Sequence, residues 1–321
     1  EVYPQYFPKQ NTELEAYQQI EKDLLDAVLY APDNTPGNKT LFTKSVARTL
    51  LAKIYAEKPL RDYTKVIQYC DEVKADGFDL VDDFSDLFGM NAAGTDAKMR
   101  NTKESILEAQ FTSGAGNWCT WMFGRDLVNW NNNFTWAKWV TPSRDLISAF
   151  KQEGDEVRFK ESIVYYDCNW SNYYPSDNYP FMYKCRSANS SIIKFRYADV
   201  LLLKAEALIM QDTPDLEGAA DIIDKVRDRA KLGALPTSVR SNKNAMLNAL
   251  LKERRLELAF EGQRWFDLVR LDKVEEVMNA VHAKDSGRKA QVYTYDKNSY
   301  RLPIPQSVID ANDKIHQNPG Y

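Results

Sequence analysis

The sequence predicts a mostly α-helical fold in which paired helices support long, irregular loops. Apolar residues recur at helical spacing near the start of the chain and again in its later part. Between these parts lie two long segments that are rich in Trp, Tyr, Asn or Ser and lack such periodicity. Of the 321 residues, 44% are hydrophobic and 27% are charged, which allows a sizeable core and excludes a disordered chain.

Three helices are predicted in the first part of the chain. The first covers residues 12–30, and Asn11 or Thr12 is its N-cap. The second begins at Thr43 and the third at Asp62. Because only a short turn separates the second helix from the third, we expect these two to form a helical hairpin.

A second hairpin of the same design follows over residues 197–231. At a constant offset, the apolar positions of its second helix match those of the third helix, for example Ala219 with Val66 and Val226 with Val73. Hairpins of this size, here about 12–75 and 197–231, are typical of tetratricopeptide-like repeats, which stack to cover one another. Two unrelated amphipathic hairpins would also look alike, so this alternative stays open.

The middle and the end of the chain contain further elements. Residues 104–111 predict a strand. Thr141 and Pro142 predict the start of a helix, with Thr141 as the N-cap and Pro142 as the first helical residue. Residues 242–260 predict a long amphipathic helix, and Gly262 is placed as its C′ residue.

The charge balance and the motifs exclude several classes of function. The chain has 42 Lys and Arg against 46 Asp and Glu, so it lacks the basic surface that nucleic-acid binding needs. Its four cysteines form no CxxC pair and it has only two histidines, which makes a zinc site improbable. Nucleophile elbows, phosphate loops, HExxH motifs and EF-hand loops are missing from the sequence. We therefore predict no nucleic-acid partner, no metal and no cofactor.

Two long segments, 112–140 and 165–191, carry the predicted binding site. Six of the seven tryptophans lie between Trp118 and Trp170, interleaved with Asn, Arg and Asp. Sugar rings present faces of C–H groups that suit the face of an indole, and their hydroxyl groups need amides and charged groups in the ring plane. The candidate ligand-binding residues are Trp118, Trp121, Arg125, Trp130, Asn132, Trp170 and Tyr173.

Other roles for these aromatic residues are possible. The tryptophans could form a core that holds the first loop to the helices, and Trp136 and Trp139 suit that role best because they lie just before the predicted helix. Stacked nucleobases would use the same side chains, but the acidic charge balance argues against them. Cys168 and Cys185 bracket the second loop, and we expect them to be thiols rather than a disulfide.

A charged block, ERRLELAFEGQRWFDLVR, covers residues 253–270 and contains four acids and four arginines. Arg254 lies on the apolar stripe of its helix, so we expect it to be buried and paired. A catalytic interpretation would make two of the acids a general acid and a nucleophile. We favour a structural ion-pair network, because the acids lie in helical core segments rather than in loops.

Several segments resemble the SusD/RagB family. They are FRYADVLLLKAEAL at 195–208, the charged block at 253–270 and RLPIPQSVIDANDKIHQNPGY at 301–321. TPSRDL at 141–146 is similar to the family's Pro-Thr-x-x-Leu block, with serine in place of threonine. The resemblance covers most of the chain and leaves 112–140 and 165–191 as variable loops. It implies a single SusD-like domain over residues 1–321.

The resemblance also implies a location, partners and a function. Proteins of this family are outer-membrane lipoproteins on the cell surface of Bacteroidetes, which bind glycans without catalysis and pass them to a SusC-like TonB-dependent transporter. No signal peptide, lipid-anchored cysteine or leading repeats precede Glu1 in this sequence. We therefore expect an N-terminally truncated chain, without the lipid anchor, whose helix from Thr12 exposes an apolar face.

Two alternatives to glycan delivery remain from the sequence. A helical-repeat protein could bind only a transporter or a peptide, and quenching of tryptophan fluorescence by sugar would distinguish it. A glycoside hydrolase is weakened by the lack of an obvious carboxylate pair in the aromatic loops.

Overall fold

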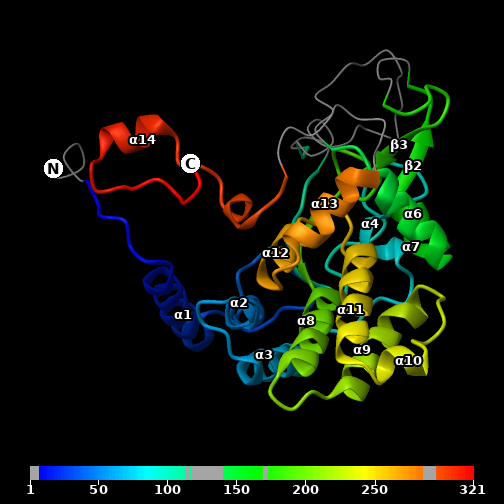
Figure 1. Ribbon diagram of the computed structural model, residues 1–321. Helices are drawn as coiled ribbons and strands as arrows, with labels where there is room; N and C mark the ends of the chain where they lie inside the picture. Colours follow the sequence, from blue (N-terminus) through cyan, green and yellow to red (C-terminus); the bar gives the residue numbers. More distant parts are fainter. Residues whose placement is uncertain (1–6, 113–115, 118–139, 169–172, 285–293) are drawn as a thin grey trace.

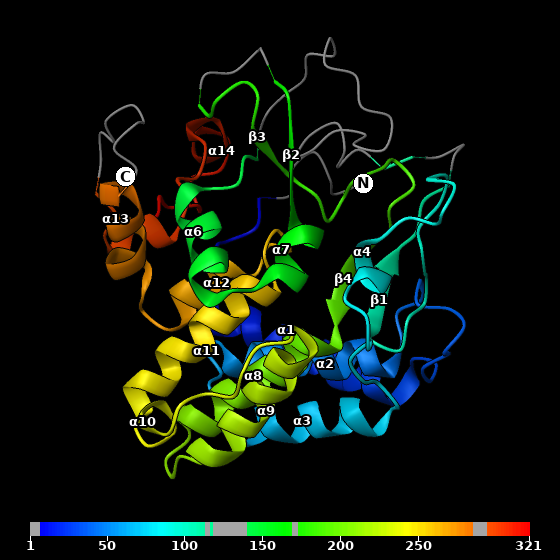
Figure 2. The ribbon, with the colours of Figure 1, turned by 90° about the vertical axis from the view of Figure 1, so that its right-hand side faces the viewer.

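The computed structural model describes residues 7–112, 116–117, 140–168, 173–284 and 294–321, and it confirms a mostly α-helical fold (Figure 1). Most of the longer helices form one end of the molecule, and the strands 163–166 and 179–182 lie at the other end together with several shorter helices (Figure 2).

The first three helices lie side by side. They are α1 (Glu13–Tyr30), α2 (Lys44–Ala56) and α3 (Tyr63–Ala75), and α2 packs against both neighbours. In α1, the Thr12 hydroxyl accepts the amide of Glu15 while the Glu15 carboxylate accepts the amide of Thr12, so Thr12 is the N-cap. The predicted boundaries of this part of the chain are confirmed to within a residue or two.

The second group of helices packs around α8 (Tyr197–Met210). This helix contacts α2 and α3 on one side and α9 (Leu216–Arg229) and α11 (Lys243–Glu257) on the other. Asp215 caps α9 and Asn242 caps α11, each by accepting a backbone amide of the first turn. Because α8 is enclosed on several sides, it is apolar around most of its surface rather than along one stripe.

The largest hydrophobic core lies between these helices. It includes Leu51 of α2, Val66 of α3, Leu202 of α8, Ile223 of α9 and Leu250 of α11, none of which is exposed. Each comes from an apolar position that recurs at helical spacing. The helical hairpins therefore share one core instead of forming separate domains.

Two small antiparallel sheets connect this core to the loops. β1 (Ser105–Ala109) pairs with β4 (Ile192–Arg196), which runs directly into α8. β2 (Ile163–Tyr166) pairs with β3 (Tyr179–Met182), so the two ends of the segment between them lie side by side. The strand predicted at 104–111 is confirmed as the shorter β1.

Shorter helices flank these sheets and complete the chain. In Figure 2, α6 and α7 lie beside β2 and β3, at the opposite end of the molecule from α9 and α10. These remaining elements are α4 (Ser85–Phe88), α6 (Arg144–Glu153), α7 (Glu156–Ser162), α10 (Thr237–Arg240), α12 (Arg264–Arg270), α13 (Val274–Lys284), the 3₁₀ helix η2 (Lys297–Tyr300) and α14 (Gln306–Ala311).

Two predicted helix ends are wrong. α6 starts at Arg144 rather than Pro142, because the hydroxyl of Ser143 accepts the amide of Leu146 and makes Ser143 the N-cap. α11 ends at Glu257 rather than near Gly262, because the chain then enters a turn in which Phe260 has a φ of 65°. Gly262 lies at the end of that turn and is not the C′ residue of α11.

The chain ends form an arm beside the helices (Figure 1). Residues 7–13 contact the C-terminal segment: Asn312 donates to the Pro8 carbonyl over 2.9 Å, and the amide of His316 donates to the Gln10 side chain over 2.9 Å. None of the helices in the described ranges is long and apolar enough to cross a membrane.

The outer face of α1 is apolar and exposed, as the sequence predicted. Leu24 is the buried residue of this helix, whereas five large hydrophobic side chains are exposed. These are Leu14, Ile20, Leu25, Leu29 and Tyr30.

The contrast between α8 and α1 gives a stability prediction. Leu202→Ala leaves a cavity in the core and should lower the free energy of unfolding by about 2–5 kcal/mol. Leu29→Ala, the matched control at a position 66% exposed, should change it by less than about 0.5 kcal/mol. Chemical denaturation of both variants measures the difference. Equal losses would contradict the described packing of α1.

Candidate functional site

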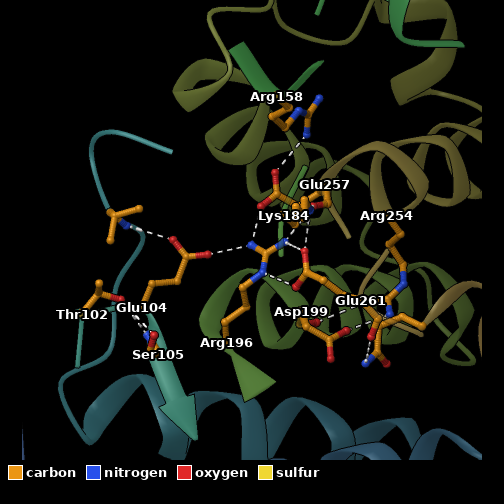
Figure 3. A network of polar contacts seen from close by, with 12 residues as sticks. Thr102, Glu104, Ser105, Arg158, Lys184, Arg196, Asp199, Arg254, Glu257 and Glu261 are labelled. Atoms are coloured by element: carbon orange, nitrogen blue, oxygen red, sulfur yellow. Dashed lines mark hydrogen bonds and ion pairs between the residues drawn. The ribbon is translucent and has the colours of Figure 1, made fainter. Parts of the chain in front are cut away.

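A ring of four buried ion pairs joins four segments of the chain. Glu104 accepts from Arg196 over 2.8 Å (Figure 3). It also accepts from Arg229 over 2.6 Å. Glu257 accepts from Arg196 over 2.5 Å and also pairs with Arg229, which closes the ring. All four residues are buried. Two carboxylates and two guanidinium groups cancel in charge, so the ring meets the requirement that buried charges be paired.

Two further residues, Arg158 and Glu261, extend this ring toward the loops. Arg158 of α7 donates to Glu257 over 3.1 Å, and Arg196 also donates to Glu261 over 2.6 Å. Burial alone would raise the pKa of the Glu257 carboxyl, but the guanidinium groups of Arg229, Arg196 and Arg158 hold it well below its usual range.

A second network surrounds Arg254. Its guanidinium donates to Asp199 over 2.8 Å and binds both oxygens of Asp267, each over 2.8 Å. Lys53 pairs with Asp199 over 2.5 Å, and Arg270 pairs with Asp267 over 2.8 Å. Arg254 is 1% exposed, so the prediction that it is buried and paired is confirmed.

These carboxylates fit the structural interpretation of the charged block. A glycosidase acid must hold its proton near neutral pH, which requires a raised pKa. Despite burial, Arg254 and Arg270 lower the pKa of Asp267, just as three arginines lower that of Glu257. Both groups are therefore held ionised, in sites that stabilise the packing of α11 against its neighbours.

Of the seven predicted ligand-binding residues, the structure describes Tyr173. The guanidinium carbon of Arg144 lies 4.3 Å from the centre of its ring, and the Tyr173 carbonyl accepts a hydrogen bond from Arg144. Tyr174 stacks edge-on against Tyr173 with centroids 4.8 Å apart, and its hydroxyl donates to the Pro142 carbonyl over 2.7 Å. Arg144 thus covers one face of the half-buried Tyr173 ring.

The other six predicted ligand-binding residues lie outside the described residues. They are Trp118, Trp121, Arg125, Trp130, Asn132 and Trp170, and Trp136 and Trp139 lie outside as well. The geometry brings Tyr173 to the start of α6, directly after the first aromatic segment.

Arg144 was not among the predicted ligand-binding residues. It lines a cavity of about 490 Å³ between α6 and α11, together with Ser148, Gln152, Lys252 and Arg255. The volume is within the usual range for small-molecule sites. The sequence signal that could have identified Arg144 is its position just after the Trp-rich segment.

A second cavity, of about 510 Å³, lies beside β3 and the turn after α11. Its walls are mainly apolar and include Phe88, Met182 and Phe260. Lys184 also lines it and donates to Glu261 over 2.6 Å and to the Glu257 carbonyl over 2.8 Å. Burial lowers the pKa of the Lys184 ammonium group to about 8, although Glu261 opposes this.

Cys168 and Cys185 are both buried, and no disulfide joins them to each other. The Cys185 sulfur lies 3.4 Å from the Asn117 side-chain oxygen.

The chain is similar to SusD proteins in sequence. Residues 179–321 match the model of the SusD family. SusD-like protein P38 of Formosa agariphila is 42% identical over 139 residues, which are 41% of this chain and 25% of the relative. SusD-like protein P2 of the same organism is 33% identical over 142 residues, which are 42% and 27% of the two chains. The matched region thus spans about a quarter of each curated relative.

Solved structures share the fold over almost the whole chain. A SusD-like protein from Bacteroides fragilis has a TM-score of 0.73 at 22% identity, over 98% of this chain and 72% of that one. A laminarin-binding SusD-like protein has a TM-score of 0.67 at 25% identity, over 96% and 69%. Surface glycan-binding protein A from Bacteroides thetaiotaomicron, in complex with laminarihexaose, has a TM-score of 0.72 at 19% identity, over 97% and 72%.

The Arg254 network predicts a large loss of stability. Arg254→Ala leaves Asp199 and Asp267 buried with fewer partners and should lower the free energy of unfolding by about 3–5 kcal/mol. The matched control is Arg301→Ala, because Arg301 is half exposed and its ion pair within the described residues is with the exposed Glu13. That control should change stability by less than about 1 kcal/mol. An unchanged melting midpoint for Arg254→Ala would show that the network does not hold α11.

The lowered pKa of Lys184 predicts that the free energy of unfolding depends on pH. Between pH 8 and the ordinary lysine pKa of 10.5, the unfolded chain binds more protons at Lys184 than the folded chain, so the free energy of unfolding rises with pH over this range. Lys184→Met should remove this effect, because Arg196 still donates to both acceptors. The variant should be at least as stable as the parent at pH 7, and its advantage should fall by about 3 kcal/mol by pH 10.5.

Urea denaturation of the parent and of Lys184→Met from pH 7 to 10.5 measures this difference. A variant that loses several kcal/mol at pH 7 would show that the Lys184 charge stabilises the fold.

Proposed function

We propose that this chain, a member of the SusD-like family, binds oligosaccharide at its loop-rich end and does not catalyse a reaction. The observation that carries the proposal is the density of tryptophans interleaved with Asn, Arg and Asp in 112–140, next to the described contact of Tyr173 with Arg144. Segments 112–140 and 165–191 would be the ligand loops of one domain over 1–321.

The chemistry of these groups suits a carbohydrate. Indole and phenol faces stack on the C–H face of a pyranose ring, while amides and guanidinium groups hydrogen-bond to its hydroxyls. Trp118, Trp121, Trp130 and Trp170 would supply the stacking faces, and Arg125 and Asn132 the polar contacts. The cavity beside Arg144 adds polar side chains close to Tyr173. Similar proteins that bind laminarin and laminarihexaose support this ligand class and make laminarihexaose the first probe.

The family supports a wider role as well. We infer that the full-length protein is held by a lipid anchor on the extracellular face of the outer membrane, where it delivers glycan to a SusC-like TonB-dependent transporter. The helical hairpins at about 12–75 and 197–231 would be tetratricopeptide-like supports for the ligand loops.

One observation favours a second candidate function. The exposed apolar face of α1, with Leu14, Leu25 and Leu29, would suit a protein that binds a transporter or a peptide without recognising glycan. A chain that binds no glycan but forms a complex through α1 would favour this alternative.

Tryptophan substitutions test the glycan proposal. Trp118→Ala, Trp121→Ala or Trp130→Ala should weaken laminarihexaose binding by about 1–3 kcal/mol if the residue is a stacking platform, by analogy with stacked bases. A core tryptophan should instead lower stability by about 3–5 kcal/mol. Calorimetric titration and thermal melting of each variant separate the two effects.

Trp265→Ala is the control, because Trp265 lies on α12 and its ring packs near Tyr295 instead of lying in an aromatic loop. It should leave binding unchanged. If the three loop variants melt early but the folded fraction binds normally, the platform is elsewhere, and Trp170 and Tyr173 are the next residues to test.

A further inference from the structure

A third cavity, of about 380 Å³, lies between the loop after α4, the end of α7 and the turn after β3. Its walls are more polar than apolar, in contrast to the cavity beside Lys184. Asn91, Ala92, Glu161, Tyr183 and Arg186 are among the residues that line it. None of them is among the seven predicted ligand-binding residues, although Tyr183 and Arg186 lie within segment 165–191.

A buried ion pair forms one wall of this cavity. Arg186 is 5% exposed and Glu161 is 9% exposed, and the Nη2 atom of Arg186 donates to Oε2 of Glu161 over 2.8 Å. The Nε atom of Arg186 donates to the Tyr183 carbonyl over 2.9 Å, and its guanidinium carbon lies 3.6 Å from the centre of the Tyr183 ring. The pair is therefore held in place by contacts on three sides.

This pair has hydrogen-bonding capacity to spare. Within the described part of the chain, neither Nη1 of Arg186 nor Oε1 of Glu161 has a hydrogen-bond partner, and neither does the Tyr183 hydroxyl. None of these three atoms is among the buried atoms without a partner, so all three are accessible to solvent or to a ligand. A charged donor and a charged acceptor side by side can satisfy two neighbouring hydroxyl groups of one ligand.

The walls of the cavity are tied together before any ligand binds. The Asn91 side chain accepts the amide of Thr95 over 2.9 Å, and Asn189 donates to the Thr95 carbonyl over 2.7 Å. Lys98 pairs with Asp83 over 3.0 Å and with Asp86 over 2.7 Å. A preformed site loses little conformational entropy on binding.

The turn after β3 also contacts residues 116–117, near the start of the aromatic segment 112–140. The Asn117 amide donates to the Ala188 carbonyl over 2.8 Å, and its side chain donates to the Ser190 carbonyl over 2.8 Å. At Gly116 an added Cβ would lie 2.9 Å from the Ala188 Cβ, so glycine permits this close approach. Asn117 is therefore held by residues that lie two and four positions after Arg186 in the sequence.

The charges around the cavity favour a neutral ligand. Arg186 and Glu161 cancel each other, and the Lys98 ammonium group is already paired with two carboxylates. Counted together, these described groups carry one net negative charge and no surplus cation, which disfavours an acidic sugar.

We propose that this cavity is a second subsite, which binds one neutral sugar ring of the oligosaccharide through hydroxyl groups that donate to Glu161 and accept from Arg186. The inference rests on the proposed glycan binding and adds a place and a ligand class to it. The volume, at the small end of ligand sites, suits one ring rather than a chain of rings.

Two substitutions test the subsite in the full chain. Glu161→Gln keeps an oxygen for Arg186 but turns a donor toward the ligand, so it should weaken laminarihexaose binding about tenfold, as for one hydrogen bond to a charged group. Ala92→Phe should weaken it by blocking the cavity from an exposed position, with little risk to folding. Ala93→Phe is the matched control, because Ala93 is also exposed and is not among the residues that line the cavity.

Calorimetric titration with laminarihexaose, maltohexaose, xylohexaose and hexagalacturonate separates the outcomes. Weaker binding of a neutral hexasaccharide by Glu161→Gln and Ala92→Phe, but not by Ala93→Phe, supports the subsite. A parent chain that binds a hexasaccharide, with both cavity variants binding it equally well, overturns the subsite and leaves the proposed function standing. Preference for hexagalacturonate overturns the neutral-ring assignment. A parent chain that binds none of the four overturns the proposed function and the subsite together.

Discussion

The closed ring of Glu104, Arg196, Glu257 and Arg229 is the constraint on which the rest of the structure depends. Each of these charges would be costly to bury alone, and each is paired twice within the ring. The four residues come from the start of β1, the junction of β4 with α8, the end of α9 and the end of α11. A shift of any one segment would leave a buried charge without a partner. The ring thus couples the pairing of β1 with β4 to the packing of the helices.

The same ring explains how the helical end of the molecule supports the loop-rich end. Arg158 links Glu257 to α7, which leads into β2, and Glu261 links Arg196 to Lys184, which follows β3. The hairpin that carries Tyr173 is therefore fixed at both of its bases by buried charges. Binding groups held on such a rigid support need less ordering when a ligand arrives.

Sequence reasoning succeeded where the deciding interactions are local. Thr12 and Asp62 cap helices through amides three residues away, and Arg254 could be placed in the core because its own helix supplies the apolar stripe. The pairing of Glu104 with Arg196 could not be predicted, because the two residues meet only through the register of β1 with β4. The end of α11 was misplaced for a similar reason. The turn after it brings Glu261 to Arg196, a tertiary requirement that overrides the helical pattern.

The candidate site likewise contains some residues that the sequence could identify and others that only the packing reveals. Composition pointed to the aromatic segments, and of the residues chosen there Tyr173 is the one within the described ranges. Arg144 and the Glu161–Arg186 pair come together through packing, and no periodicity in the sequence marks them. The two kinds of carboxylate also differ in what they can do. Glu257 has both oxygens engaged by arginines, whereas one oxygen of Glu161 has no hydrogen-bond partner within the described residues. A binding protein needs both kinds: a carboxylate with both oxygens paired helps to make the support rigid, and a carboxylate with one unpaired oxygen at its edge can recognise a ligand.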